Sequence, residues 1–353
     1  MKKKQNHADR LETSIILTNY NGMPFLIESV ESILIQTYKN FELIIVDDGS
    51  NDGSVNYLKS IKDKKVKILL NKKNQGQTFC LNKALKISKG KFISRMDSDD
   101  IACKNRLEKQ VEFLNKNEEI DIVGSQVRLI DENGKKIGKI ILPCSSSSIW
   151  AYSLMHNPFV HPTVTIRKKI LNSLDKIYDN KFINQDFELW SRLLLDIKAA
   201  NLNEILLYYR QHQSNMSKTF LEKNLHSTSI LIEKRLKNEN IFCDLKLEEI
   251  ENIQKYFLND RKYANQKKIK RLDLGKQYFK FYNFILSKYK INNEIKSFIV
   301  NRLLISSFQF NIKNLKEFFY EIKFLLQIFI KFPIYFLRCI TILFFRKFFL
   351  YGN

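Results

Sequence analysis

Short apolar segments alternate with helix-like stretches over residues 14–130, and this alternation restricts the fold more than any other feature of the chain. The apolar segments are residues 14–18, 43–46, 66–70 and the segment that begins at 92; the helix-like stretches are 24–36, 55–61, 76–88 and 105–115. Continuous β-branched segments separated by helices are typical of a parallel sheet that is covered on both faces. Right-handed crossovers then produce a doubly wound layer. We therefore predict an α/β fold with a mostly parallel sheet, followed by an α-helical C-terminal region.

Polar or small residues follow each of these apolar segments directly. The four polar clusters are residues 19–22, 47–50, 71–76 and 97–100. Open α/β sheets bind their ligands at the carboxyl ends of the strands. Because all four clusters fall on that edge, we expect a ligand site there.

The acidic run Asp97-Ser98-Asp99-Asp100 stands at the end of the fourth apolar segment. Three carboxylates in four residues repel one another unless a cation or a set of hydrogen-bond donors holds them. Aspartate oxygens are hard ligands that suit Mg²⁺ or Mn²⁺. The alternative is a solvated acidic turn that caps a helix beginning near Lys104. The other polar clusters at the same edge favour the metal site.

The composition fits a folded protein of more than one average domain. The chain has 353 residues, 44% of them hydrophobic, and can bury a sizeable core. Its five cysteines form no CxxC pair, which favours a reducing compartment over a thiol metal site. Residues 1–4 lead into polar sequence rather than an apolar stretch, so we expect no signal peptide and a cytoplasmic location.

The net charge of +22 is concentrated in the C-terminal part of the chain. Residues 211–353 carry 26 basic and 12 acidic side chains and are almost wholly helical in pattern. Such a field favours anionic partners. We predict four regions: a basic tail (1–12), a catalytic domain (13–215), a basic helical region (216–318) and aromatic, basic amphipathic helices (319–353).

Several ordered motifs carry a resemblance to a known family. They are SIILTNYN (14–21), IVDDGS (45–50), NQG (74–76), MDSDD (96–100), HPTV (161–164) with Arg167, QDFELW (185–190) and YRQH (209–212). In their order and spacing the chain resembles the family 2 glycosyltransferases over about residues 12–217. These are inverting enzymes of the GT-A fold that use nucleotide-diphospho-sugars.

The resemblance implies a donor site on the first two strand ends. Thr18 and Tyr20 are expected near the nucleotide, Asp48 on the base and Gln75 in a turn near the donor. A carboxylate acceptor suits the N3–H of a pyrimidine, which favours a uridine donor. The alternatives are strand-end packing for Thr18 and Tyr20, and a helix cap near Asp52 for Asp48 or its neighbour Asp47.

The triplet Asp97-Ser98-Asp99 matches the DxD motif of the family, which implies a divalent metal, Mg²⁺ or Mn²⁺. Asp99 is then the principal metal ligand, and Asp97 with Ser98 faces the ribose or a metal-bound water. Asp100 is expected to cap the following helix. The metal would stabilise the charge that develops on the leaving nucleoside diphosphate.

Asp186 is the general base that the resemblance implies, on the face opposite the leaving group. The aromatic residues Phe187 and Trp190 would desolvate it and raise its basicity. The alternative is an N-cap for the helix 187–195, and the two roles are compatible. Residues 209–212 end a strand and enter a polar loop. Arg210 and His212 on that loop either close over the pyrophosphate or belong to an ordinary exposed loop.

Residues 319–353 are rich in Phe, Leu and Ile, with basic residues at intervals of seven or eight. No uncharged stretch is long enough for a spanning helix. The pattern favours helices at an anionic membrane surface, on the inner face of the cell membrane. Packing on the catalytic domain or on a second subunit is the alternative.

The sequence therefore predicts an inverting, metal-dependent glycosyltransferase of the hexosyl or N-acetylhexosaminyl type. Its donor would be a UDP-sugar and its acceptor a hydroxyl of a saccharide, lipid-linked, in surface polysaccharide synthesis. One rival is a non-catalytic nucleotide- or carbohydrate-binding module on the same fold. The other is a nucleic-acid-binding protein, suggested by the pI of 9.6, but the motif-bearing half has no reader motif, so no nucleic-acid partner is expected.

Overall fold

The computed structural model describes residues 11–174, 176–213, 221–239, 241 and 246–257, and the single positions 281, 285 and 333. The chain divides into two compact units. The first comprises Met1–Ser146 and Asn157–Phe220, and the second comprises Ser147–His156 and Leu221–Asn353.

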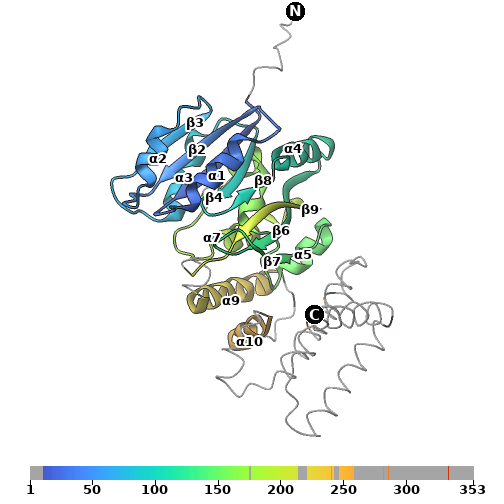
Figure 1. Cartoon of the computed structure of the whole chain (residues 1–353). Coiled ribbons are helices and arrows are strands. Elements are labelled where there is room, and N and C mark those ends of the chain that lie inside the picture. The colour runs from blue at the N-terminus through green and yellow to red at the C-terminus, as the bar shows by residue number, and fades with distance from the viewer. Residues whose placement is uncertain are drawn as a thin grey trace, which may run out of the picture. The chain divides into compact units, whose positions relative to one another are not determined.

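One sheet organises the first unit (Figure 1). Its nine strands, counted over the described residues, run in the order β3-β2-β1-β4-β8-β6-β9-β5, with β7 beside β6. Their bounds are β1 (Thr13–Asn19), β2 (Phe41–Asp47), β3 (Val66–Leu70), β4 (Phe92–Asp97), β5 (Ile101–Ala102), β6 (Ile120–Ile130), β7 (Lys136–Ile140), β8 (Thr165–Arg167) and β9 (Lys198–Arg210).

The strands β3, β2, β1 and β4 are parallel, as the sequence predicts. β8 then runs antiparallel to both β4 and β6, while β6 and β9 are parallel. The predicted α/β fold with a mostly parallel sheet is confirmed. The antiparallel insertion of β8 comes from residues 120–210, whose pattern is irregular.

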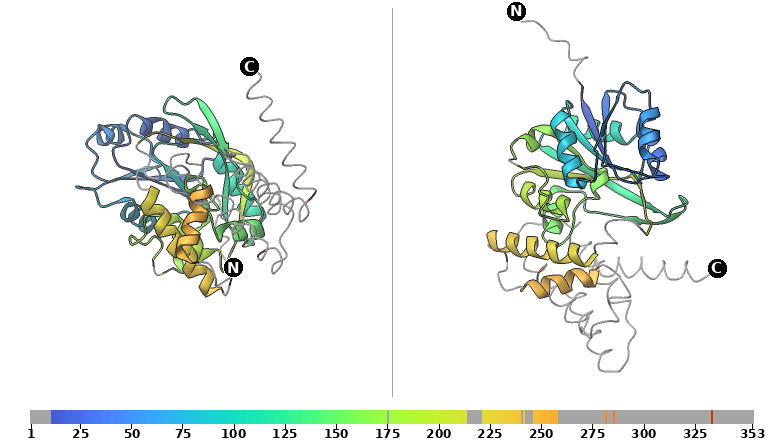
Figure 2. Two further views of the ribbon diagram at one scale, coloured as in Figure 1. Left: turned by 90° about the horizontal axis from the view of Figure 1, so that it is seen from below. Right: turned by 90° about the vertical axis from the view of Figure 1, so that its left-hand side faces the viewer.

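Helices cover both faces of this sheet (Figure 2). Their bounds are α1 (Phe25–Leu34), α2 (Ser54–Ser60), α3 (Gln77–Ile87), α4 (Arg106–Lys116), the 3₁₀ turn η2 (His161–Thr163), α6 (Lys168–Asn172) and α7 (Gln185–Leu193). Successive side chains of a strand point to opposite faces. Ile15 and Leu17 of β1 accordingly join the core cluster with α1 and α4, whereas Ile16 lies with Leu81 and Leu85 of α3. This is why the strand is apolar at every position.

The second unit is helical where it is described. It contains most of α5 (Ser146–Ser153), together with α9 (Leu221–Asn238) and α10 (Leu247–Phe257). Arg235 of α9 is buried and donates to the hydroxyl and carbonyl oxygens of Ser153, at 2.8 and 3.2 Å. The Ser229 hydroxyl donates to Gln254 of α10 at 3.1 Å.

The predicted membrane-associating segment, residues 319–353, lies outside the described residues except at position 333. The basic tail and much of the basic helical region also lie outside them. Within the described helices, none combines the length and apolar character needed to cross a bilayer.

Candidate active site

The ends of β1, β2 and β4 form a row at one edge of the sheet. In the register, Thr18 lies opposite Asp97 of β4 and Asn19 opposite Asp47 of β2. The Asp47 carboxylate is buried, accepts the backbone N–H groups of the turn that follows it, and accepts the Asn19 amide at 2.8 Å. Asp47 therefore fixes the loops after β1 and β2.

Asp48, the next residue, organises the loop after β3. It is 3% exposed and accepts the backbone N–H groups of Gln75 and Gly76 at 2.9 and 2.7 Å and the Asn71 amide at 2.7 Å. The Gln75 side chain is exposed. Neither Asp47 nor Asp48 caps α2, because that helix begins at Ser54, whose N–H is accepted by Asp52. The capping alternative is wrong.

Arg95 connects the nucleotide side of the site to the acidic run. Its side chain on β4 is buried and donates to the Asp97 carboxylate, to the carbonyl of Met96 and, at 3.3 Å, to the Thr18 hydroxyl. Thr18 is buried, whereas Tyr20 is 52% exposed. The guanidinium group of Arg95 is thus paired with Asp97, the first carboxylate of the run.

Asp97, Asp99 and Asp100 each have a carboxylate oxygen that lies within 4.8 Å of the other two. Burial and the charges of Asp99 and Asp97 raise the pKa of Asp100 well above its usual range. Within the described residues, the second oxygen of Asp100 has no hydrogen-bond partner. Three hard carboxylate oxygens this close together fit a divalent ion such as Mg²⁺ or Mn²⁺.

Asp100 does not cap the next helix, contrary to the prediction. One of its oxygens accepts the backbone N–H of Arg210 at 2.9 Å. The N-cap of α4 is Asn105, which makes no side-chain cap bond. The sequence analysis counted Asp100 in the acidic run but assigned it to the helix cap and not to the metal.

A strand ends at Arg210, as predicted, but Arg210 itself belongs to the strand and not to the polar loop. It is the last residue of β9 and is 2% exposed. Its guanidinium donates to the carbonyls of Asp99 and Glu132 at 2.9 and 3.0 Å and to the Glu28 carboxylate. Arg210 therefore holds the backbone of the acidic run in place.

His212 contacts the same run through its side chain. Its Nε2 lies 2.9 Å from the Asp99 carboxylate, and its ring lies 5.2 Å from that of Phe25. His212 thus contacts Asp99, the residue predicted to be the principal metal ligand.

Asp186 reaches this edge from α7. It lies in the first turn of the helix, and the N-cap is Asn184, so the capping alternative for Asp186 is wrong. Burial raises the pKa of Asp186, against the hydrogen bonds of the Phe187 N–H and the Asn157 amide, the latter at 2.6 Å. The hydrogen bonds orient the Asp186 carboxylate, and its burial partly desolvates it.

Asp186 also interacts electrostatically with the acidic run. Burial raises the pKa of Asp97, and the charges of Asp99 and Asp186 raise it further, while Arg95 opposes them. Gln185 adds a structural link, because its amide donates to Gln77 at 2.6 Å and its oxygen accepts the Thr78 hydroxyl at the start of α3. α3 in turn follows the loop that surrounds Asp48.

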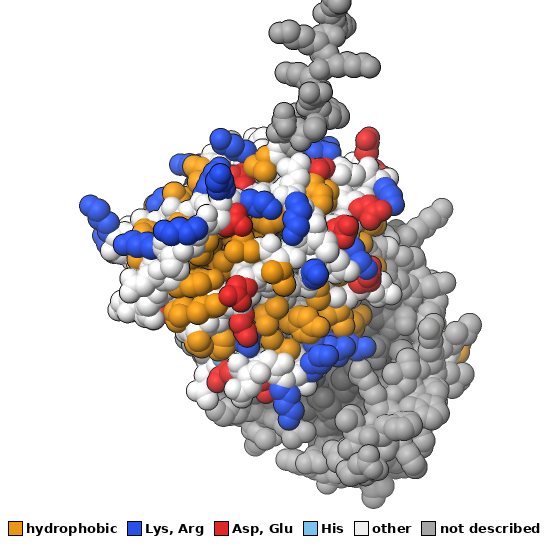
Figure 3. All heavy atoms as spheres, turned by 45° about the horizontal axis from the view of Figure 1, so that its top comes forward, with side chains coloured by type: hydrophobic (Ala, Val, Ile, Leu, Met, Phe, Trp, Pro, Cys, Tyr) orange, Lys and Arg blue, Asp and Glu red, His pale blue; other side chains and the backbone are white. Residues whose placement is uncertain are grey.

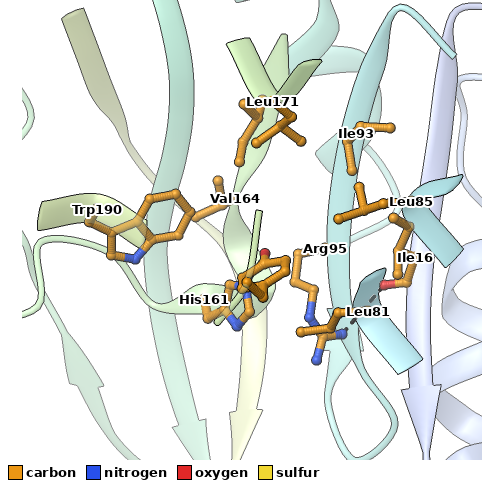
Figure 4. Close-up of a pocket in the computed structure, with 11 residues that line it drawn as sticks. Ile16, Leu81, Leu85, Ile93, Arg95, His161, Val164, Leu171 and Trp190 are labelled. Carbon is orange, nitrogen blue, oxygen red and sulfur yellow. Dashed lines mark hydrogen bonds between the residues drawn. The ribbon is translucent and has the colours of Figure 1, made fainter. Parts of the chain in front are cut away.

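A small apolar cavity lies behind these residues (Figure 4). His161 and Arg95 lie at its edge, and the Trp190 ring lies on the far side of His161 from Arg95, with the His161 and Trp190 ring centroids 6.0 Å apart. The His161 Nε2 lies 2.9 Å from the Tyr178 hydroxyl, and burial lowers the pKa of His161 well below its usual range. His161 is therefore neutral and has a structural role at the edge of this cavity.

Two residues of the site went unnoticed in the sequence. Arg95 had a signal, since a cation inside an apolar strand needs a buried carboxylate partner. Asn157 had none, because it stands in an irregular segment and meets Asp186 only through tertiary packing.

Comparisons with known proteins identify the family of this chain. The model of the family "Glycosyl transferase family 2" matches residues 14–175. An uncharacterized glycosyltransferase of Methanocaldococcus jannaschii, MJ1057, is 36% identical over 67% of this chain and 83% of its own. The Escherichia coli UDP-Glc:alpha-D-GlcNAc-diphosphoundecaprenol beta-1,3-glucosyltransferase WfgD is 33% identical over 58% and 79%.

The fold matches a solved glycosyltransferase as well. The crystal structure of Staphylococcus aureus TarS 1–349 in complex with UDP-GlcNAc has a TM-score of 0.56 at 19% identity, over 84% of this chain and 87% of that one. The sheet with its strand-end acidic site is of the GT-A type. The chain belongs to glycosyltransferase family 2, as the motifs predict.

Proposed function

We propose that the protein is an inverting, divalent-metal-dependent glycosyltransferase. It transfers a hexosyl or N-acetylhexosaminyl group from a UDP-sugar to a hydroxyl of a saccharide acceptor. The observation that supports this most is that Asp186 interacts with the carboxylates at the end of β4. Its charge raises the pKa of Asp97.

Asp186 is the general base in this proposal. Its carboxylate accepts the proton of the acceptor hydroxyl as that oxygen attacks the anomeric carbon and the bond to the diphosphate breaks. Such positioned proton transfer is worth about 10²–10⁴-fold in rate. One displacement on the face opposite the leaving group inverts the anomeric configuration.

Asp97 and Asp99 would hold the divalent ion, with Asp100 beside them and His212 on Asp99. The ion would stabilise the negative charge of the nucleoside diphosphate as it leaves. Thr18, Tyr20, Asp48, Gln75 and Ser98 line the nucleotide side of the proposed site. Arg210 acts on the substrate through the backbone of Asp99.

A lipid-linked acceptor in surface polysaccharide synthesis fits the relatives and the charge distribution. The name of WfgD specifies an acceptor on diphosphoundecaprenol. The excess of basic residues after position 210 and the aromatic segment 319–353 suit an anionic membrane surface on the cytoplasmic side.

The rival functions have less support. A non-catalytic module would not need a half-buried, oriented carboxylate at Asp186 beside an acidic cluster. For nucleic-acid binding, a continuous basic surface is expected. Figure 3 shows a face of the first unit on which Lys and Arg side chains are mixed with Asp and Glu.

A donor screen tests the proposal. The full chain is incubated with nucleotide-diphospho-sugars, with Mn²⁺, Mg²⁺ or EDTA, and the release of nucleoside diphosphate is measured. We expect metal-dependent release from a UDP-sugar and thermal stabilisation by UDP plus metal. Absence of turnover and stabilisation with every donor would reject the proposal.

A further inference from the structure

We propose that Asn157 is a positioning residue for the carboxylate of Asp186, orienting it and keeping it ionised. This inference rests on the proposed function, in which Asp186 is the base. It concerns a residue that belongs to none of the sequence motifs.

The orientation of the Asn157 amide is fixed by its two hydrogen bonds. Its Oδ1 accepts the backbone N–H of Phe159 at 3.3 Å. Its Nδ2 is consequently left to donate to the Asp186 Oδ2, at 2.6 Å. An amide that is fixed at its oxygen offers the carboxylate one defined donor direction.

The segment that carries Asn157 is itself held in place. Asn201 of β9 donates to the carbonyl of Pro158 at 3.1 Å. Phe159 is buried and packs edge-on against Trp190 of α7, with ring centroids 5.2 Å apart. Because Trp190 and Asp186 share α7, the packing fixes donor and acceptor relative to each other.

Other charged groups act on Asp186 but do not duplicate this bond. Arg95 of β4 lowers the pKa of Asp186 through space, and Asp97 lies close enough for the two carboxylates to interact. Tyr178, whose pKa is raised by burial, also faces this pair. On α7 itself, Glu188 is paired with Arg192 at 2.6 Å. Among the described residues, Asn157 is thus the one whose side chain donates a hydrogen bond to the Asp186 carboxylate.

A hydrogen bond from a neutral amide favours the ionised form of a carboxyl. Loss of that bond should therefore raise the pKa of Asp186 by about one unit. Asn157→Asp should raise it further, because two neighbouring carboxyls resist ionising together. A purely structural role for Asn157 would not shift this titration.

The test compares wild type, Asn157→Ala and Asn157→Asp by ¹³C NMR of protein labelled at the aspartate carboxyl carbons. The measurement is made on the full chain without nucleotide or metal. The Asp186 signal is assigned by its loss in Asp186→Asn. Asn157→Asp also serves if Asn157→Ala folds poorly. Asn115→Ala is the matched control. Asn115 lies on α4, and its amide also donates to a carboxylate, that of Glu12, at 2.8 Å.

We expect the Asp186 midpoint to rise in both Asn157 variants and to stay unchanged in Asn115→Ala. The acid limb of kcat against pH should move by the same amount, with the KM for the donor unchanged. An unmoved Asp186 midpoint in both Asn157 variants overturns the inference. If the midpoint moves but the wild type turns over no donor, the proposed function fails while the control of Asp186 by Asn157 stands.

Discussion

The two sides of the candidate site are built in different ways. On the nucleotide side, Asp47 and Asp97 end β2 and β4, Asp48 follows β2, and backbone N–H groups of the adjoining loops bind Asp47 and Asp48. On the opposite side, Asp186 is held by Asn157, a residue from an irregular segment. The carboxylates of the first side are signalled by their places at strand ends in the sequence, whereas the segment that holds Asp186 carries no motif.

This difference suggests a division of work. In the proposed mechanism, the nucleotide side binds the donor and stabilises charge, and the α7 side provides proton transfer. If so, variants on the two sides should affect different measurements.

Asp186→Asn should have the largest effect on the chemical step. Removal of the base is expected to reduce kcat by about 10²–10⁴-fold, because an amide cannot accept the proton. Nucleoside diphosphate release measures the rate, and UDP titration with Mn²⁺ measures binding, which should stay near the wild-type affinity. Full turnover by Asp186→Asn would remove the residue from the mechanism.

Asp99→Asn should act on the nucleotide side. It removes the proposed metal ligand that His212 contacts at 2.9 Å, so both turnover and metal-dependent UDP binding should fall. We expect a loss of about 10²-fold or more in kcat, the scale of one lost electrostatic contact to the developing charge. Unaltered binding together with reduced turnover would break the division between the two sides.

The pH dependence should report the burial of Asp186. Burial raises its pKa, so it protonates at a higher pH than an ordinary aspartate, for which the value is about 3.9. Because only the ionised form accepts a proton, kcat should fall about tenfold per pH unit below the raised pKa. An acid limb as low as that of an exposed aspartate would contradict this account.

Gly22→Ala should have the smallest effect, and on stability. A Cβ at Gly22 would lie 2.1 Å from Asn19 Oδ1, so the buried Asn19–Asp47 contact must shift. We expect a loss of about 1–3 kcal/mol in the free energy of unfolding, measured in urea. Gly138→Ala on β7, where the nearest atom is 3.4 Å away, is the control. Equal stability losses would mean that the Asn19 loop is not tightly packed.

The sequence predicts the nucleotide side well, because β-branched segments and the polar residues after them are local signals. β3 matches its predicted range, and β1, β2 and β4 extend theirs by a few residues. Asp48 stands at its predicted strand end. The sequence did not indicate that the backbone N–H of Gln75 would donate to the Asp48 carboxylate.

The α7 side was predicted only in part. The helix and Asp186 were evident from the spacing of Phe187, Leu189 and Trp190, and the position of Asp186 in the family motif. Arg210 was misplaced because a polar sequence after it suggested a loop, whereas β9 buries it against Glu28 and two carbonyls. Burial of an arginine depends on partners that only the folded chain brings together.

A crystal structure with UDP and Mn²⁺ tests the central claim most directly. The account predicts an anomalous Mn²⁺ peak at the Asp97 and Asp99 carboxylates, the uracil against Asp48, and Asp186 facing the space beyond the diphosphate. A metal bound away from Asp99, or a nucleotide that leaves Asp186 outside the sugar site, would contradict it.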